Sequence, residues 1–212
     1  MQTRREFIIA GGAAGLFLMS GFGRPSLGFA NELSQGAAQF VTDLGQRALD
    51  ALAGARQMSQ VEVAQKLRTF LEEGFDTQTI GRFVLGRYWN VATAEQRQEY
   101  MQLFQDLIVN IYSKRFSDYS GGAGFEVVNH RPEGERDAVV TSRIMRPSGG
   151  PPVTVDWRVR RGNAGYKVID VAVEGLSMSV TQRDEFTSVI ERGGGNVQAL
   201  LDALRAQTQG RG

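Results

Sequence analysis

The chain of 212 residues has 24 basic and 23 acidic side chains, no cysteine and a single histidine, His130. Without cysteine there is no disulfide framework and no iron–sulfur cluster, and one histidine cannot build a structural zinc site by itself. The balanced charge also differs from the marked basic excess of nucleic-acid-binding domains.

The first thirty residues are predicted to be an export signal. Arg4 and Arg5 precede a short hydrophobic stretch, as in a twin-arginine signal, and the apolar run over residues 8–22 is too short to span a bilayer comfortably. An uncleaved anchor helix is the alternative, but several glycines in this run weaken a helix, and Ala30 suits a cleavage site. We therefore expect a protein exported to the periplasm, with a signal peptide at residues 1–30.

The mature chain is expected to be one domain spanning residues 31–212. Without residues 1–30 it carries 21 basic and 22 acidic residues, a net charge of −1. A chain of this length buries roughly 70% of its unfolded surface, which is enough for a core with a cavity inside it. No later segment is apolar enough to cross a membrane.

Helical periodicity and end signals predict three helices early in the mature chain. Ser59 and Glu62 form a capping box, Asp76 can cap the next helix, and Gly86 can end it. These helices are expected over residues 32–52, 59–74 and 76–86.

A longer helix is predicted to follow. Thr93 and Gln96 form its capping box, and an apolar stripe continues to about Phe116. The glycines after Ser120 should end it.

After this helix the apolar period changes to two, which predicts four strands joined by short turns. In the third run, valines and Trp157 alternate with Asp156, Arg158 and other polar residues, as expected for a sheet with one covered face. Two more helices, from about Thr181 and after Asn196, close the chain. The strands are expected over residues 125–130, 137–146, 153–160 and 166–173, in an antiparallel α+β fold.

Few residues offer catalytic chemistry. His130 is predicted to be an exposed histidine in a turn at a strand end. Asp156 and Asp170 could form a carboxylate pair across two strands, or could equally be ion-paired to Arg143 or neighbouring arginines. The glycines at 193–195 lack a phosphate-binding lysine and are interpreted as a linker between helices.

Three stretches of the mature chain resemble the MlaC/toluene-tolerance family of periplasmic lipid carriers. They are Phe-Val-Leu-Gly-Arg-Tyr-Trp at 83–89 with Ala-Thr-Ala-Glu-Gln-Arg at 92–97, Pro-Pro-Val-Thr-Val-Asp-Trp-Arg at 151–158, and the segment 168–178 with Thr-Gln-Arg at 181–183. The joint pattern is more specific than any single piece.

The resemblance implies a single domain whose N-terminal and two C-terminal helices pack over a curved four-stranded antiparallel sheet that encloses an apolar pocket. It implies no catalytic residue, metal or cofactor. Its partners would be a phospholipid or related lipid, an inner-membrane ABC transporter with an MCE-domain protein, and an outer-membrane lipoprotein complex. The twin-arginine signal departs from many relatives, which leaves open another lipid, as in hopanoid-associated relatives.

By position, the resemblance implies a lipid-binding wall made of residues from the helices, the sheet and the segment after it. These residues are Phe83, Tyr88, Phe104, Leu107, Ile108, Ile111, Tyr112, Phe116, Val155, Trp157, Val171, Val173 and Met178. Periodicity alone does not separate such a wall from a filled core.

Two alternatives to a carrier remain at this point. One is an enzyme for a small apolar substrate on a cone-shaped α+β fold, with Asp156 or His130 as the base. The other is a scaffold that binds no ligand. The exposed arginines Arg158, Arg160 and Arg161 could contact acidic partners or headgroups, although a solvated strand face explains them equally well.

Overall fold

A computed structural model describes residues 27–54, 57–119, 124–146 and 149–209, with side chains over 30–51, 57–113, 124–146 and 149–208. Residues 1–26 of the predicted signal peptide lie outside the described residues, and the first helix, α1 (Leu27–Gly54), starts inside the predicted signal. The other helices are α2 (Gln60–Gly74), α3 (Thr77–Leu85), α4 (Tyr88–Val91), α5 (Ala94–Tyr119), α6 (Met178–Arg192) and α7 (Val197–Gln209).

The helices α2, α3 and α5 begin where their local end signals predict. Ser59 and Glu62 form the reciprocal capping box of α2, and Asp76 accepts the backbone N–H of Thr79 at 2.9 Å to cap α3. Thr93 and Gln96 exchange backbone and side-chain hydrogen bonds of 3.1 and 3.2 Å at the start of α5. These predictions are confirmed because each signal needs only partners three residues apart.

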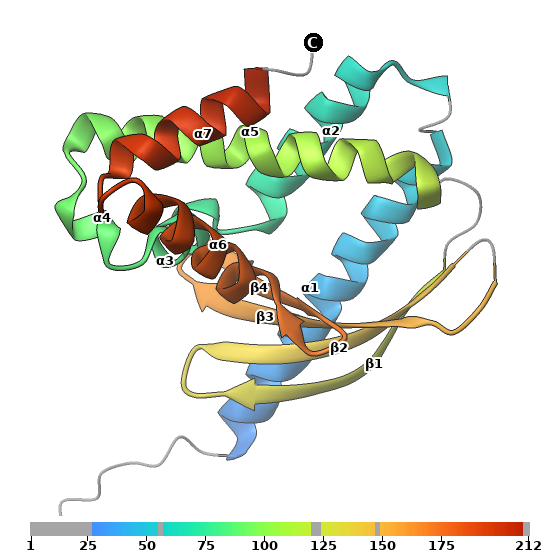
Figure 1. The fold of residues 1–212 in the computed structure, drawn as a ribbon. Helices are drawn as coiled ribbons and strands as arrows, with labels where there is room; N and C mark the ends of the chain where they lie inside the picture. The colour runs from blue at the N-terminus through green and yellow to red at the C-terminus, as the bar shows by residue number, and fades with distance from the viewer. Residues whose placement is uncertain (1–26, 55–56, 120–123, 147–148, 210–212) are drawn as a thin grey trace, which may run out of the picture.

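Five antiparallel strands follow one another in the order of the chain. They are β1 (Gly124–Glu133), β2 (Asp137–Met145), β3 (Val153–Gly162), β4 (Gly165–Val173) and β5 (Leu176–Ser177). The predicted α+β class is confirmed, and the short β5 and the short α4 are additions. Figure 1 shows α1 running against the sheet and α5 and α7 lying above it.

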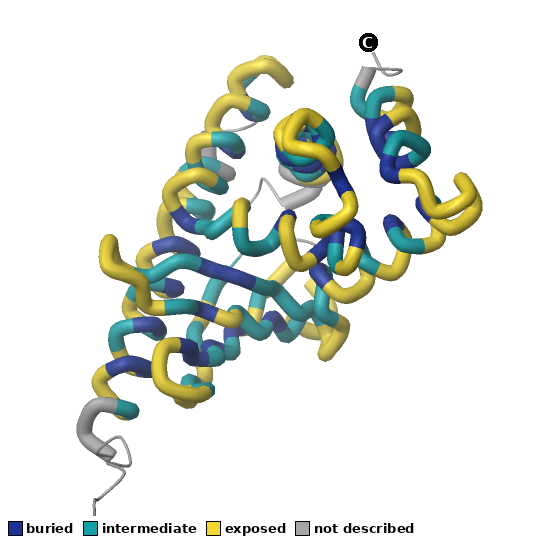
Figure 2. Tube along the Cα trace, turned by 90° about the vertical axis from the view of Figure 1, so that its left-hand side faces the viewer, coloured by how far each residue is buried: buried dark blue, intermediate teal, exposed yellow. Residues whose placement is uncertain are grey.

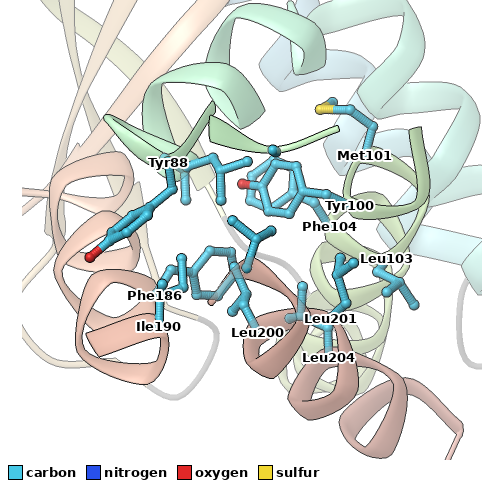
Figure 3. Close-up of a cluster of buried hydrophobic side chains, with 14 of the residues drawn as sticks. Tyr88, Tyr100, Met101, Leu103, Phe104, Phe186, Ile190, Leu200, Leu201 and Leu204 are labelled. Atoms are coloured by element: carbon cyan, nitrogen blue, oxygen red, sulfur yellow. The ribbon is translucent and has the colours of Figure 1, made fainter. Parts of the chain in front are cut away.

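Two separate clusters of buried side chains form the core. The sheet core joins α1 to the inner face of the sheet, where Val41 and Leu44 pack against Val140 and Val159. The helical core joins α5, α6 and α7 to α3 and α4, and Figure 3 shows Tyr100 and Phe104 at its centre. Burial raises the pKa of the Tyr100 phenol, whose O–H donates to the carbonyl of Gly81 at 3.0 Å.

The helical layer is attached to the sheet at β4. Phe75, between α2 and α3, forms a bridge with Val168, and the N–H of Asp76 donates to the Val168 carbonyl at 2.9 Å. Lys167 donates to the carbonyls of Glu72 and Glu73 at 2.8 and 2.6 Å and so ends α2. These bonds set how α2 and α3 meet the sheet.

Two predictions about ends are wrong. His130 does not lie at a strand end, because β1 continues to Glu133, and its half-buried ring has Nδ1 3.1 Å from the Oγ of Ser34 in α1. The helix expected from about Thr181 begins at Met178, because Ser177 caps it by accepting the N–H of Val180. β1 is longer than predicted because its last residues pair with β2. α6 begins earlier than predicted because Ser177, which ends β5, caps it.

Candidate functional site

The inner face of β3 carries both completely buried and partly accessible apolar side chains. Val159 is completely buried beneath α1, and Val155 is buried as well. Trp157 and Val153 are only half-buried. The sheet therefore presents apolar side chains beyond the area that α1 covers.

The neighbouring strands extend this surface. Val155 pairs with Val173 of β4 and with Ser142 of β2, and Trp157 pairs with Val171. Half-buried Ile144 of β2 lies opposite Val153. We call the inner-face residues Ile144, Val153, Val155, Trp157, Val171 and Val173 the apolar strip; none of them is ionisable.

Trp157 is held at the border between the strip and the sheet core. Its indole N–H donates to the Oγ of Ser142 at 2.9 Å, and that hydroxyl donates in turn to the carbonyl of Val155 at 3.4 Å. The ring meets Phe125 edge to face, with centroids 6.2 Å apart. The buried polar atoms of this border are thereby satisfied while its surface stays apolar.

The helix α5 lies over this part of the sheet in both views (Figures 1 and 2). Its buried side chains Tyr100, Phe104 and Leu107 pack in the helical core. Further along, Ile108 is half-buried, and Ile111 and Tyr112 are 37% and 43% exposed. Ile111 and Tyr112 are thus partly exposed side chains of α5 that do not belong to the helical core.

The structure places some of the predicted wall residues in the helical core and others near the strip or on the surface. Tyr88, Phe104 and Leu107 belong to the helical core, with Ile108 packed at its border. Phe83 is 43% exposed at the surface of α3.

The strip and its surroundings contain most of the remaining predicted residues. Val155, Trp157, Val171 and Val173 form part of the strip, Ile111 and Tyr112 lie on α5, and half-buried Met178 begins α6. The side chain of Phe116 lies outside the described residues.

Sequence reasoning missed Ser142, Ile144 and Val153. A signal was present: Ser142 is the one polar residue in the alternating series Ala138, Val140, Ser142, Ile144 on the covered face of β2. A single hydroxyl on such a face needs a partner, and the indole of Trp157 is that partner.

The candidate acid–base residues each have a local role. Asp156 accepts the hydroxyl of Thr141 at 2.6 Å. Asp170 accepts the Ser177 hydroxyl at 2.6 Å and the N–H of Ser179 at 3.2 Å, which holds the start of α6. The two carboxylates are not cross-strand partners, since Asp156 pairs with Ala172, and Asp170 with Arg158.

Charged side chains of β2 and β3 form an ion-pair cluster at the other end of β3. Arg160 bonds Asp137 through two nitrogens at 2.7 and 2.8 Å, and Arg158 contributes a third bond of 3.1 Å. The hydrogen bond from Arg160 is the main cause that lowers the pKa of the Asp137 carboxyl. Two of the three arginines considered for docking are therefore engaged within the sheet.

Within the described ranges, no group of three histidine or acidic side chains could hold a metal ion. No helix among the same residues has the length and apolar content needed to cross a bilayer.

Comparisons with known proteins agree with this architecture. A phospholipid-binding protein from Ralstonia solanacearum, solved in complex with a phospholipid, superposes with a TM-score of 0.74 at 25% identity, covering 82% of this chain and 97% of that one. The intermembrane phospholipid transport system binding protein MlaC of Haemophilus influenzae is 27% identical over 145 residues, which are 64% of this chain and 67% of that protein. The family model described as MlaC protein matches residues 42–206, and the chain therefore belongs to the MlaC family.

Proposed function

We propose that this protein is a periplasmic carrier that binds a phospholipid through its acyl chains and transfers it between the inner and outer membranes. The observation that carries the proposal is the apolar strip, a partly accessible surface without an ionisable side chain that continues the sheet core beneath α5. The names of the Haemophilus and Ralstonia relatives support phospholipid as the ligand.

The acyl chains would lie between the strip and the partly exposed residues Ile108, Ile111 and Tyr112 of α5. In this arrangement Trp157 and Val155 form the floor, and Ile108, Ile111 and Tyr112 form the opposite wall. Met178 would border the site from the start of α6. The residues buried in the helical core, such as Phe104, would support the wall from behind.

The energetics of transfer fit a site of this kind. Each buried methylene contributes about 0.8 kcal/mol, so a phospholipid with roughly thirty methylenes does not cross water unprotected. A carrier has to match the bilayer closely, because it must both receive the lipid and give it up. Aliphatic and aromatic side chains provide such burial without chemical groups that would retain the headgroup.

The route and the partners follow from the same proposal. The twin-arginine sequence at Arg4 and Arg5 would export the chain to the periplasm. There it would exchange lipid with an inner-membrane ABC transporter that carries an MCE-domain protein and with an outer-membrane lipoprotein complex. No step requires catalysis by the carrier.

Organic extraction of the purified exported protein, followed by mass spectrometry, tests the ligand. We expect about one phospholipid per protein chain. Hopanoid or another lipid in place of phospholipid would change the identity of the cargo, and the absence of any stoichiometric lipid would leave the scaffold alternative instead.

The wall is tested by Ile111→Arg, which places a charge against the acyl chains at an already accessible position. The folded variant should retain less than about one tenth of the bound lipid, since an unpaired charge against hydrocarbon costs several kcal/mol. Val61→Arg, on a 66% exposed residue of α2, is the matched control and should purify with lipid. Full lipid content in a folded Ile111→Arg protein would contradict the proposed wall.

A further inference from the structure

A second feature of the surface lies apart from the strip, where α3, α4 and α6 meet at one end of the helical layer (Figure 1). A hollow of about 440 Å³ opens there between Phe83 and Trp89, and its only charged lining residues are Arg82 and Arg183. Thr79, Gly86 and Asn90 complete the lining. We call these residues the arginine hollow.

Local backbone geometry brings the two sides of the hollow together. Gly86 ends α3 at φ 58°, a conformation that residues with a Cβ rarely adopt. A Cβ at this position would lie 3.4 Å from the Cδ of Arg183. Glycine therefore permits the turn into α4, which lies beside Arg183 of α6.

Stacking on aromatic rings holds the guanidinium groups in place. The guanidinium carbon of Arg82 lies 5.9 Å from the ring centroid of Trp89, and that of Arg183 lies 4.9 Å from the centroid of Phe83. Arg97, which does not line the hollow, lies 5.5 Å from the Trp89 centroid and donates to the carbonyls of Trp89 and Asn90 at 2.7 and 3.4 Å. A stacked guanidinium keeps its N–H donors directed outward in the plane of the group. The hollow therefore presents oriented donors and positive charge.

These charges lack strong internal partners. Among the described residues, no carboxylate oxygen lies within 4.0 Å of a nitrogen of Arg82. The pair of Arg183 with Asp184, at 3.9 Å between exposed side chains, contributes little. Neighbouring Arg87, which does not line the hollow, is paired with Glu191 at 2.6 Å.

We infer that the arginine hollow is the docking site for an acidic segment of a partner protein. Arginine and large aromatic residues together are typical of the central contacts of protein interfaces, and unpaired arginines complement carboxylates. A protruding side chain or loop fills a concave surface, whereas a flat membrane does not. The inference rests on the proposed carrier function, because a carrier must dock where it receives and delivers lipid.

The experiment uses the double variant Arg82→Glu/Arg183→Glu of the full exported protein. The probes are the purified soluble domain of the MCE-domain protein and the outer-membrane lipoprotein from the same organism, with vesicles of phosphatidylcholine and phosphatidylglycerol as a separate probe. Arg131→Glu/Arg143→Glu is the matched control, since it reverses two exposed arginines on the outer face of the sheet. Lipid content is measured for every variant.

We expect the hollow variant to bind at least one of the two proteins about tenfold or more weakly, with its lipid content unchanged, and the control to bind normally. Binding by the original protein should weaken as salt is raised. If the proposed carrier function is wrong, the unmodified protein itself should contain no lipid. Lipid in both the unmodified protein and the hollow variant therefore separates a loss of docking from a failure of the proposed function.

Several outcomes would overturn the inference. Equal binding by the hollow variant, loss of binding only in the sheet-face control, or no binding of the original protein to either probe protein would each do so. Arginine-dependent binding to the anionic vesicles alone would assign the hollow to a membrane surface instead.

Discussion

Asp137 is a buried carboxylate that two arginines of the adjacent strand hold in place. Arg160 approaches it at 2.7 Å and Arg158 at 3.1 Å, while the Asp137 side chain is 8% exposed. Because the hydrogen bond from Arg160 lowers the pKa of Asp137, the charged form is favoured in the folded state. The stabilisation is therefore present above the ordinary aspartate pKa, near 3.9, and is lost as the pH falls through the lower folded value.

Asp137→Asn should lower the free energy of unfolding at neutral pH by about 1–2 kcal/mol, discounted because both arginines are partly exposed. Urea unfolding at pH 7 and at a series of acidic values measures this difference. It should shrink below about pH 4, where the original protein loses the same contribution. Asp43→Asn, at an exposed position, should behave like the original protein, and a difference for Asp137→Asn that does not depend on pH would contradict the argument.

Ser142 and Trp157 form the hydrogen bond that borders the strip. Ser142→Ala removes the acceptor and should destabilise the protein by about 1 kcal/mol, because the half-buried indole N–H loses its partner. Trp157→Phe removes the donor. A double-mutant cycle measured by chemical unfolding should show a coupling of about 1 kcal/mol between the two positions, and additive effects would mean that the bond contributes nothing.

At the scale of elements, α1 approaches the sheet through two glycines. A Cβ at Gly45 would lie 2.4 Å from the ring of Phe125, and one at Gly36 would lie 2.3 Å from the Tyr166 hydroxyl. The absence of a side chain at Gly45 lets the helix rest close to β1, and the Tyr166 hydroxyl occupies the corresponding space at Gly36. Its apolar residues Val41 and Leu44 can then bury completely against the strands.

Gly45→Ala tests this close approach. Alanine favours a helix by about 1 kcal/mol over glycine, yet the clash with Phe125 should leave the protein about 1–3 kcal/mol less stable. Thermal unfolding of Gly45→Ala, Phe125→Leu and the double variant separates the two effects. The leucine should recover part of the loss in the double variant, and a stabilised single Gly45→Ala protein would show that α1 has room to move.

At the scale of the whole molecule, two cores meet at a surface that neither of them closes. The helical core is joined to the sheet at β4 through Phe75 and Val168, and α5 extends over the sheet (Figure 1). Under the proposed function, lipid would complete the packing between the layers. Stability should therefore depend on the ligand as well as on the chain.

Removal of the bound lipid should lower the unfolding temperature by about 5–10 °C. A ligand at a hundred times its dissociation constant stabilises by about 2.7 kcal/mol, and a domain of this size shifts by about 2–4 °C per kcal/mol. Scanning calorimetry before extraction, after extraction and after reloading with phospholipid measures the change. Ile111→Arg is the control and should not respond to reloading; identical unfolding temperatures with and without lipid would contradict a ligand between the layers.

Local patterns were sufficient to predict most of the elements. The caps at Ser59, Asp76 and Thr93 depend on residues three positions away, and the alternation through Trp157 is a property of one strand. The linker at residues 193–195 also follows from local glycine chemistry, with Gly194 and Gly195 at positive φ. The end of β1 and the start of α6 were not predicted correctly, because they depend on other elements: β1 pairs with β2, and the Ser177 cap of α6 is held by Asp170 of β4.

The sequence by itself determined the α+β order, the covered face of the sheet and the family resemblance. Only the tertiary structure decided that Phe104 and Leu107 belong to a closed helical core while Trp157 belongs to a partly accessible strip. It also brought Arg82 and Arg183, about a hundred residues apart, to one hollow. The physical reason is that the periodicity of a sequence indicates which side of a helix or strand is apolar, whereas burial of that side depends on which other element packs against it.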